Sequence, residues 1–340
     1  MSATAYEPAH PAEDVDDVPR VLRGAGEWQD KVFRGIARGS GAVVLGIMLL
    51  VGVFLGYRAT KALHVAKWKF LTTAAWEPDS HHFGIAAVLT GTVLIGLVAI
   101  LIAVPLAMGT ALYISEYAPR RIRRTLVSLV DLMAAVPSVV YGLWGAFFLQ
   151  GHVTGVARFI SEYFGWIPLF KVSGTDPRDP LSTNTVYTSS TFIAGMVVAL
   201  MVTPIACSVM REAFTQAPGG EREGAYALGA TKWGMIRTVV LPFGLGGIIG
   251  GTMLGLGRAL GETIAVYMII SPVFAIQPHL LQNGANSVSA LIALRYGSAS
   301  NFGTSALMAA GLALFVLTLI VNFVASSIVA RSRSGAGTEA

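Results

Sequence analysis

The chain is organised around one stretch, EREGAYALGATKWGMIRTVVLPFGLGGIIGGTMLGLGRALGET (residues 221–263). Its first part is charged and rich in small residues, and Gly229 can end a short helix with a left-handed turn. Its second part is too hydrophobic for a surface helix, yet it contains Arg258 and Glu262. The stretch therefore joins a segment suited to contact with a soluble partner to a membrane helix that carries two charges.

The first part predicts a short helix, a turn and a second short helix beside the membrane. Small residues recur between good helix formers in 223–230, so another protein can approach the backbone closely. The second helix is expected to have one apolar face, formed by Trp233, Met235, Ile236 and Val239. Pro242 suits the first turn of the following helix. An ordinary amphipathic connector between spans is the plainer alternative.

Composition places the chain in a membrane. Of its 340 residues 54% are hydrophobic and only 13% are charged, which is far from a soluble composition. Six apolar runs reach the about 20 residues that a helix needs to cross a bilayer core. The predicted spans are 40–57, 84–112, 126–149, 191–213, 243–271 and 303–330. Because lipid offers no partners for open backbone groups, the expected fold is an all-α membrane protein with six transmembrane helices.

These spans define the expected domain organisation. Residues 34–330 form the transmembrane domain, with a loop at about 214–242. Residues 1–33 are rich in proline and acidic residues and lack the basic start and apolar core of a secretion signal, so a flexible cytoplasmic tail is predicted. Residues 331–340 form a short cytoplasmic tail.

The distribution of Lys and Arg predicts the orientation. With both termini inside, fifteen Lys and Arg residues fall in inner segments and eight in outer loops, and Arg258 is the remaining one of the 24. The excess favours a cytoplasmic N-terminus and C-terminus. The same orientation places the loop at 214–242 on the cytoplasmic side.

The sequence lacks the residue patterns of an enzyme. It contains no nucleophile–base constellation, no cluster with metal-ligand spacing and no Gly-rich lysine motif of an ATPase. Cys207 is the only cysteine, so no intrachain disulfide forms, and we expect it to serve in packing. The basic residues lie in loops rather than in a stripe, so nucleic acid is not an expected partner.

Arg258 and Glu262 are the candidate site residues. Arg258 lies sixteen residues past Pro242, well inside the predicted span, where charges are functional candidates. On a continuous helix the two side chains lie on one face, about 6 Å apart along the axis. A guanidinium suits a tetrahedral oxyanion because its planar fork makes paired charge-assisted hydrogen bonds.

Glu262 has two possible tasks next to that guanidinium. It would hold Arg258 when the site is empty, or it would test the ligand for an acidic hydroxyl, which favours hydrogen phosphate over sulfate. A purely structural ion pair within the helix is the alternative.

A resemblance to a known family rests first on the loop. Glu223-Gly224-Ala225, then Gly229, then Leu241-Pro242 resemble in type and spacing the coupling loop of ATP-binding-cassette importer permeases. In that family the loop docks into a groove on the cytoplasmic ATPase, and the acidic residue and the glycine are its hallmarks. Gly224 stands where alanine is commoner, which exchanges one small residue for another.

Two further motifs narrow the resemblance. GRALGET (257–263) is similar to the signature of the phosphate-specific importer permeases. AVPSVVYGLWG (135–145) resembles the PstC-type subunit rather than its PstA-type partner, whereas PLAMG (105–109) and ISEY (114–117) fit both. The resemblance covers about residues 40–330.

The resemblance implies a type I (MetI-like) permease of the bacterial inner membrane with both termini inside. Such a subunit would pair with a PstA-type permease, two copies of a cytoplasmic ATPase and an extracytoplasmic phosphate-binding protein. The ATPase would use ATP and Mg, and this chain would bind no cofactor. The resemblance also implies that Arg258 and Glu262 act in phosphate passage. It implies that the residues that couple to the ATPase are Glu223, Gly224, Ala225, Gly229, Leu241 and Pro242. A permease for another oxyanion, such as sulfate or molybdate, and a phosphate-sensing signalling module stay open.

Overall fold

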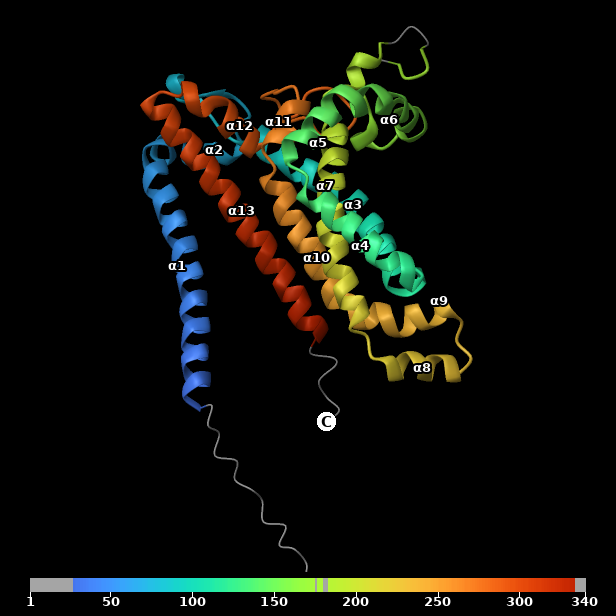
Figure 1. The fold of residues 1–340 in the computed structure, drawn as a ribbon. Coiled ribbons are helices and arrows are strands. Elements are labelled where there is room, and N and C mark those ends of the chain that lie inside the picture. The colour runs from blue at the N-terminus through green and yellow to red at the C-terminus, as the bar shows by residue number, and fades with distance from the viewer. Residues whose placement is uncertain (1–26, 175, 180–182, 334–340) are drawn as a thin grey trace, which may run out of the picture. The chain divides into compact units, whose positions relative to one another are not determined.

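The computed structural model describes residues 27–174, 176–179 and 183–333 (Figure 1). The longer helices are α1 (Glu27–Ala66), α3 (Ala86–Leu112), α4 (Arg120–Ala135), α6 (Gln150–Phe164), α7 (Thr191–Thr215), α10 (Leu241–Gly261) and α13 (Asn301–Arg333). The shorter helices are α2 (Lys69–Thr72), α5 (Ser138–Trp144), α8 (Gly219–Ala227), α9 (Lys232–Met235), α11 (Ile264–Ile269) and α12 (Val288–Arg295). The strands β1 (Trp76–Glu77) and β2 (His82–Phe83) form a small antiparallel hairpin.

Three π-helical turns and four single 3-10 turns complete the described elements. The π-helical turns are Tyr113–Tyr117, Gly145–Leu149 and Ile236–Val240. The 3-10 turns are Pro78–Ser80, Pro168–Phe170, Asn184–Tyr187 and Tyr296–Ser298. The predicted all-helical fold class is confirmed.

Five helices of the described part are long and apolar enough to cross a membrane, and a bent pair makes a sixth span if it counts as one. That pair is Arg120–Ala135 with Ser138–Phe164, and its two arms meet at 87°. The predicted span 126–149 is therefore not one continuous helix. Pro137 explains the break, because proline disfavours the helical conformation at the residue before it, and Val136 is indeed extended, with ψ 128°.

The first span also differs from the prediction. α1 begins at Glu27 and ends at Ala66, so it includes the end of the predicted tail and carries Arg58 and Lys61 on the helix rather than in an outer loop. Residues 1–26 of that tail and the C-terminal residues 334–340 lie outside the described residues. The contacts between residues divide the chain into two compact units, Met1–Val51 and Gly52–Ala340, with the boundary inside α1. The first unit contributes the apolar first part of α1, and the second contains every other described element.

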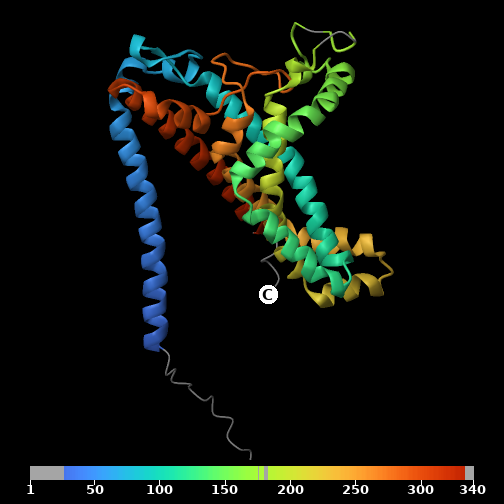
Figure 2. The same cartoon turned by 45° about the horizontal axis from the view of Figure 1, so that its top comes forward.

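The core of the second unit lies between α3, α7 and α10 with α11. Its buried side chains include Ile95, Ala99, Val197, Val202, Ala259 and Val266. A second cluster continues this core to the segment that contains α8 and α9, through Ala111, Ile114, Met210, Phe214, Met235 and Ile236. Cys207 is buried and free in that cluster, as predicted for a packing residue. Figures 1 and 2 agree that α8 and α9 lie side by side at the end of the bundle away from α12.

Glycine allows α10 to lie directly against α7. A Cβ added at one set of α10 glycines would come within 2.1–2.9 Å of atoms of α7. This set is Gly244, Gly247, Gly251 and Gly255, facing Phe214, Ala213, Ala206 and Val202. A second set, Gly246, Gly250, Gly257 and Gly261, has nothing within 4 Å of such a Cβ. The glycine-rich sequence therefore serves two faces, one for close helix packing and one that stays open.

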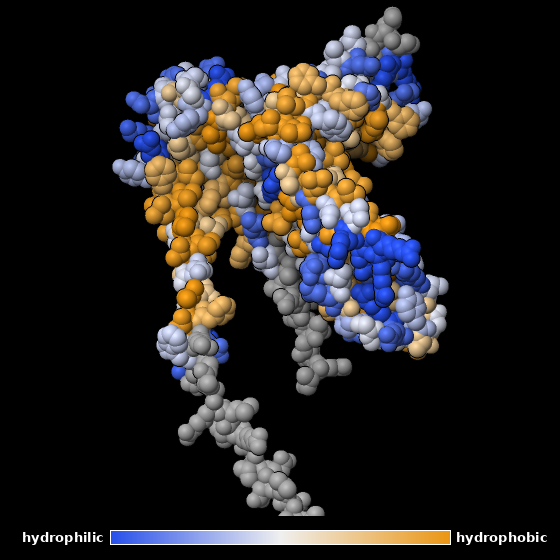
Figure 3. All heavy atoms as spheres, viewed as in Figure 1, coloured by the Kyte–Doolittle hydropathy of each residue, from blue (hydrophilic) through white to orange (hydrophobic). Residues whose placement is uncertain are grey.

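Polar residues gather at the α8–α9 end of the unit. Figure 3 shows hydrophilic residues over α8, α9 and the neighbouring end of α4, and hydrophobic residues over the middle of the helices. Arg120, Arg121 and Arg124 contribute to this end of α4. This distribution is that of a membrane domain whose α8–α9 end extends into water.

The packing of α10 predicts a contrast between two neighbouring glycines. Gly247→Ala places a Cβ 2.1 Å from the Cβ of Ala213, and overpacking of this kind costs about 1–3 kcal/mol. Gly246→Ala is the matched control, because its Cβ meets nothing and alanine is the better helix former. Thermal unfolding of the purified protein should show a lower midpoint for Gly247→Ala alone. Equal midpoints would contradict the close contact between α10 and α7.

Candidate anion site and coupling surface

Arg258 lies in the last turn of α10 and its side chain is exposed within this chain. It opens into a cavity of about 510 Å³ between α7, α10 and α13, lined by Ile205, Gly250, Met253, Leu254, Gly257, Arg258 and Asn322. Arg258 provides the one charge among these lining residues. A positive charge held in a mostly apolar cavity attracts an anion more strongly than it would in water. Arg258 therefore faces a cavity, although it lies within the predicted span.

Glu262 lies elsewhere. α10 ends at Gly261, and Glu262 has an extended backbone, with φ −66° and ψ 124°. Its side chain is buried, and Oε1 accepts a hydrogen bond from the backbone N–H of Ala265 at 3.3 Å. Among the described residues Glu262 forms no ion pair with Arg258. The prediction that both side chains share one helix face is wrong, because the helix is broken between them.

The break between α10 and α11 is stabilised by side chains. The Ser289 hydroxyl of α12 donates to the Glu262 carbonyl at 2.8 Å, and the Thr263 hydroxyl donates to the Gly261 carbonyl at 3.1 Å. With the Glu262 cap, these bonds replace those that a continuous helix would make, as the interior of a membrane requires. Discontinuous membrane helices commonly form the substrate sites of transporters. The broken 243–271 span is thus consistent with a site beside Arg258.

Asn322 was missed by the sequence analysis. It belongs to α13, and its side chain lines the Arg258 cavity. Its amide can both donate a hydrogen bond to a ligand and accept one from it. Glu262 does not line this cavity. The available signal was a single amide within the apolar run LIVNFVA (319–325).

The segment 216–242 forms the predicted helix, turn and helix. α8 ends in a Schellman motif, in which the N–H of Ala230 bonds to the Ala225 carbonyl at 3.0 Å and the N–H of Gly229 bonds to the Tyr226 carbonyl at 2.9 Å. Gly229 has a φ of 83°, so its predicted left-handed conformation is confirmed. Thr231 then caps α9 through a hydrogen bond from the N–H of Gly234.

The exposed side of this segment carries the residues expected to couple. Glu223 and Gly224 are exposed, Ala225 is half-buried, and Leu228 is 91% exposed at the turn. Pro242 lies in the first turn of α10, next to Leu241, as predicted. The predicted apolar face is only partly correct, because Met235 and Ile236 are buried whereas Trp233 is 57% exposed.

Contacts from Glu116 and Tyr117 to both helices of the segment were also missed. Nη1 of Arg222 lies 3.0 Å from Oε1 and 3.1 Å from Oε2 of Glu116, and Nη2 donates to the Phe214 carbonyl at 2.6 Å. The ammonium of Lys232 lies 4.5 Å from the centre of the Tyr117 ring. In the sequence the partners of each contact lie more than a hundred positions apart, so their pairing was not visible.

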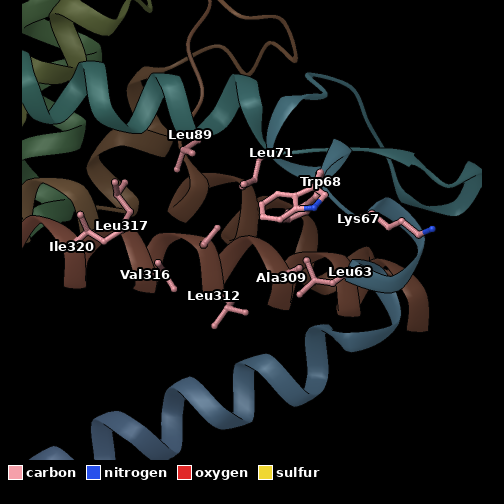
Figure 4. Close-up of a pocket in the computed structure, with 12 residues that line it drawn as sticks. Leu63, Lys67, Trp68, Leu71, Leu89, Ala309, Leu312, Val316, Leu317 and Ile320 are labelled. Carbon is pink, nitrogen blue, oxygen red and sulfur yellow. The ribbon is translucent and has the colours of Figure 1, made fainter.

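A second cavity does not suit an anion. It has a volume of about 610 Å³ between the end of α1, α2, α3 and α13 (Figure 4). Its lining is hydrocarbon, with Leu63, Leu71, Leu312 and Val316 among the side chains and Lys67 as the one charged residue. It lacks the convergent polar groups of a small-molecule site.

Comparison with known proteins shows the family to which this membrane protein belongs. Residues 103–334 match the family described as "Binding-protein-dependent transport system inner membrane component". A bacterial alginate ABC transporter, solved with an alginate-bound periplasmic protein, aligns with a TM-score of 0.57 at 17% identity over 90% of this chain and 98% of that one. The chain therefore belongs to this family of multi-pass inner-membrane proteins, with the fold of its permeases.

Its relatives narrow the family further. The phosphate transport system permease protein PstC 2 of Mycobacterium tuberculosis is 37% identical over 306 residues, which cover 88% of this chain and 91% of that protein. PstC of Mycobacterium leprae is 39% identical over 306 residues, with 88% and 92% covered, and PstC of Xylella fastidiosa is 36% identical over 297 residues, with 87% and 89% covered. The predicted resemblance to PstC-type permeases is confirmed.

The cap made by Glu262 predicts a difference between two substitutions. Glu262→Gln keeps a carbonyl that accepts from the N–H of Ala265, whereas Glu262→Ala loses it. Loss of a capping side chain costs about 0.5–2 kcal/mol, so the unfolding midpoint should fall for Glu262→Ala and stay close to that of the parent for Glu262→Gln. An ion pair with Arg258 would instead make both variants unstable, since both remove the charge.

Proposed function

We propose that the chain is the transmembrane permease subunit of an ATP-driven importer of inorganic phosphate. The observation that carries this proposal is the guanidinium of Arg258, exposed to a cavity beside a broken membrane helix. The names of the PstC relatives support phosphate as the substrate. The motif GRALGET, which contains both Arg258 and the helix break, supports it further.

Arg258 and Asn322 would contact the anion, each in its own way. The guanidinium donates paired hydrogen bonds to two phosphate oxygens and stays charged at any working pH. The Asn322 amide can donate to another oxygen or accept from the hydroxyl of hydrogen phosphate. Sulfate carries no proton at neutral pH, so it cannot donate a hydrogen bond to the Asn322 carbonyl. Glu262 would act through the α10–α11 break rather than by touching the ligand.

The segment 216–242 would couple this site to ATP hydrolysis. Glu223, Gly224, Ala225 and Gly229, with Leu241 and Pro242 at the start of α10, would form the surface that docks on a cytoplasmic ATPase. This role requires both termini inside, which stays a prediction of the Lys and Arg distribution. The site then lies on the helix that directly follows the docking surface, so movement of the segment reaches Arg258 through α10.

The proposal requires partners. A PstA-type second permease would complete the translocation path, two copies of the ATPase would bind and hydrolyse ATP with Mg, and an extracytoplasmic phosphate-binding protein would deliver the substrate. This chain would bind no cofactor and would catalyse no reaction. Import of sulfate or molybdate, or a sensing role without much flux, are the alternatives that uptake assays separate.

Arg258 is expected to be needed for transport but not for folding. Because no carboxylate within the described residues pairs with Arg258, the Arg258→Gln variant should insert as well as the parent. Phosphate uptake should fall at least about tenfold, since a hydrogen bond to a charged group contributes about 1.5–3 kcal/mol. Arg258→Lys should retain part of the uptake, because it keeps the charge but not the planar fork.

Arg295→Gln is the matched control, with the same chemical change at the end of α12 outside the cavity. Uptake of labelled phosphate into proteoliposomes with the assembled complex is the measurement, with sulfate and molybdate as competitors. Normal phosphate uptake by a well-inserted Arg258→Gln variant would refute the site. If unlabelled sulfate inhibited the uptake of labelled phosphate as strongly as unlabelled phosphate does, the proposal that phosphate is the substrate would be refuted.

Gly229 is expected to act in coupling. Gly229→Val places a β-branched side chain at a φ of 83°, which distorts the turn between α8 and α9. The variant should reach the membrane normally, while phosphate uptake and ATPase activity stimulated by the binding protein fall. Gly220→Val, in the first turn of α8, is a control at an open helical position. Full transport by Gly229→Val would contradict the coupling role.

A further inference from the structure

The segment that holds α8 and α9 is attached to α3 at two points. The first is the ion pair of Arg222 with Glu116, whose side chain is only 4% exposed. The second is the contact of Lys232 with the Tyr117 ring. Glu116 and Tyr117 are neighbours in the π-helical turn that ends α3, so one turn contacts both α8 and α9. π-helical turns are rare and frequently mark functional positions.

The Glu116–Arg222 pair is also bound to the core. Arg222 donates to the Phe214 carbonyl at the end of α7, so its guanidinium joins α8, α3 and α7. Arg123 of α4 donates to the carbonyl of Ser115, next to Glu116. A charge-assisted pair that is shielded from solvent and fixed on several sides holds its geometry better than an exposed ion pair does.

α3 extends from this turn to the Arg258 region. At Gly96 of α3, a Cβ would lie 3.0 Å from the Leu260 side chain and 3.5 Å from that of Leu256, both on the last turns of α10. Leu256 and Leu260 flank Arg258 in the sequence. A displacement of α8 that moved α3 with it would therefore act on α10 beside Arg258, by a route separate from the direct connection through Pro242.

We propose that Glu116 is a positioning residue that, through Arg222, makes α8 and α3 move as one body, so that the coupling surface drives α3 as well as α10. The proposal rests on the proposed function for the origin of the movement, and Tyr117 with Lys232 provides a weaker second attachment. In this proposal Glu116 acts through Arg222 and not by contact with the anion or the ATPase.

The test measures the distance between α8 and α3 directly. Spin labels on Glu221→Cys of α8 and Leu101→Cys of α3 report it by pulsed electron resonance, and the native Cys207 is buried away from the reagent. In the assembled permease–ATPase complex, the distance should be the same without nucleotide and with ATP. With Glu116→Gln or Arg222→Gln it should broaden or change on ATP binding. The exchange Glu116→Arg with Arg222→Glu should restore a single narrow distribution.

Transport supplies the second measurement. In Glu116→Gln, ATPase should still bind and hydrolyse ATP, while phosphate imported per ATP falls at least about fivefold, the lower end of coupling between protein sites. Glu212→Gln, an exposed carboxylate at the end of α7, is the matched control and should behave as the parent. The charge exchange should recover most of the lost ratio, which a merely destabilised variant would not do.

Each outcome decides the proposal. A parent distance that changes with ATP, a Glu116→Gln distance that matches the parent, or a well-inserted charge exchange no better than the single variants would overturn it. If the parent complex imports no phosphate, the proposed substrate fails while the distances still test the attachment. If no ATPase assembles, the width of the distribution in the permease alone tests it, and unaltered width in Glu116→Gln would refute it.

Discussion

The close contact of α7 with the glycine face of α10 is the constraint on which the functional parts depend. Four glycines on one face of α10 let its backbone lie so close to the side chains and backbone of α7 that any Cβ on these glycines would clash. Lipid gives no hydrophobic driving force between helices, so such close packing supplies much of the attraction. The same helix follows directly on the segment 216–242, and its last turn carries Arg258. Its other face, with Gly250 and Gly257, lines the cavity.

The two charges of GRALGET have different tasks because the helix ends between them. Arg258 stays on α10 and is exposed to the cavity, while Glu262 caps α11 and its carbonyl is bound by Ser289 of α12. A membrane helix can be broken only where other groups satisfy its backbone. The motif therefore ends the helix just after Arg258, and of its two charged side chains only that of Arg258 faces the cavity.

Local sequence patterns predicted most of the fold, but contacts between residues far apart in the sequence could not be predicted. Hydrophobic runs located the spans, and Gly229 and Pro242 predicted the turn and the helix start, because each acts through its own backbone geometry. The size of the bend at Pro137 and the break at Gly261 were missed. In the second case the decisive partner, Ser289, lies 27 positions away from Glu262. Asn322 and the Glu116–Arg222 pair were missed for the same reason, since only folding brings them to the cavity and to α8.

The central claim is that the anion occupies the cavity beside Arg258, and protection of a cysteine in that cavity tests it most directly. Met253→Cys lies on the cavity wall, and Phe147→Cys, 84% exposed on another surface, is the control. In the assembled complex, phosphate should slow the reaction of a small thiol reagent with Cys at 253 and leave the control unchanged, whereas sulfate should slow neither. A rate at 253 that phosphate leaves unchanged, in a complex that imports phosphate, would contradict the account.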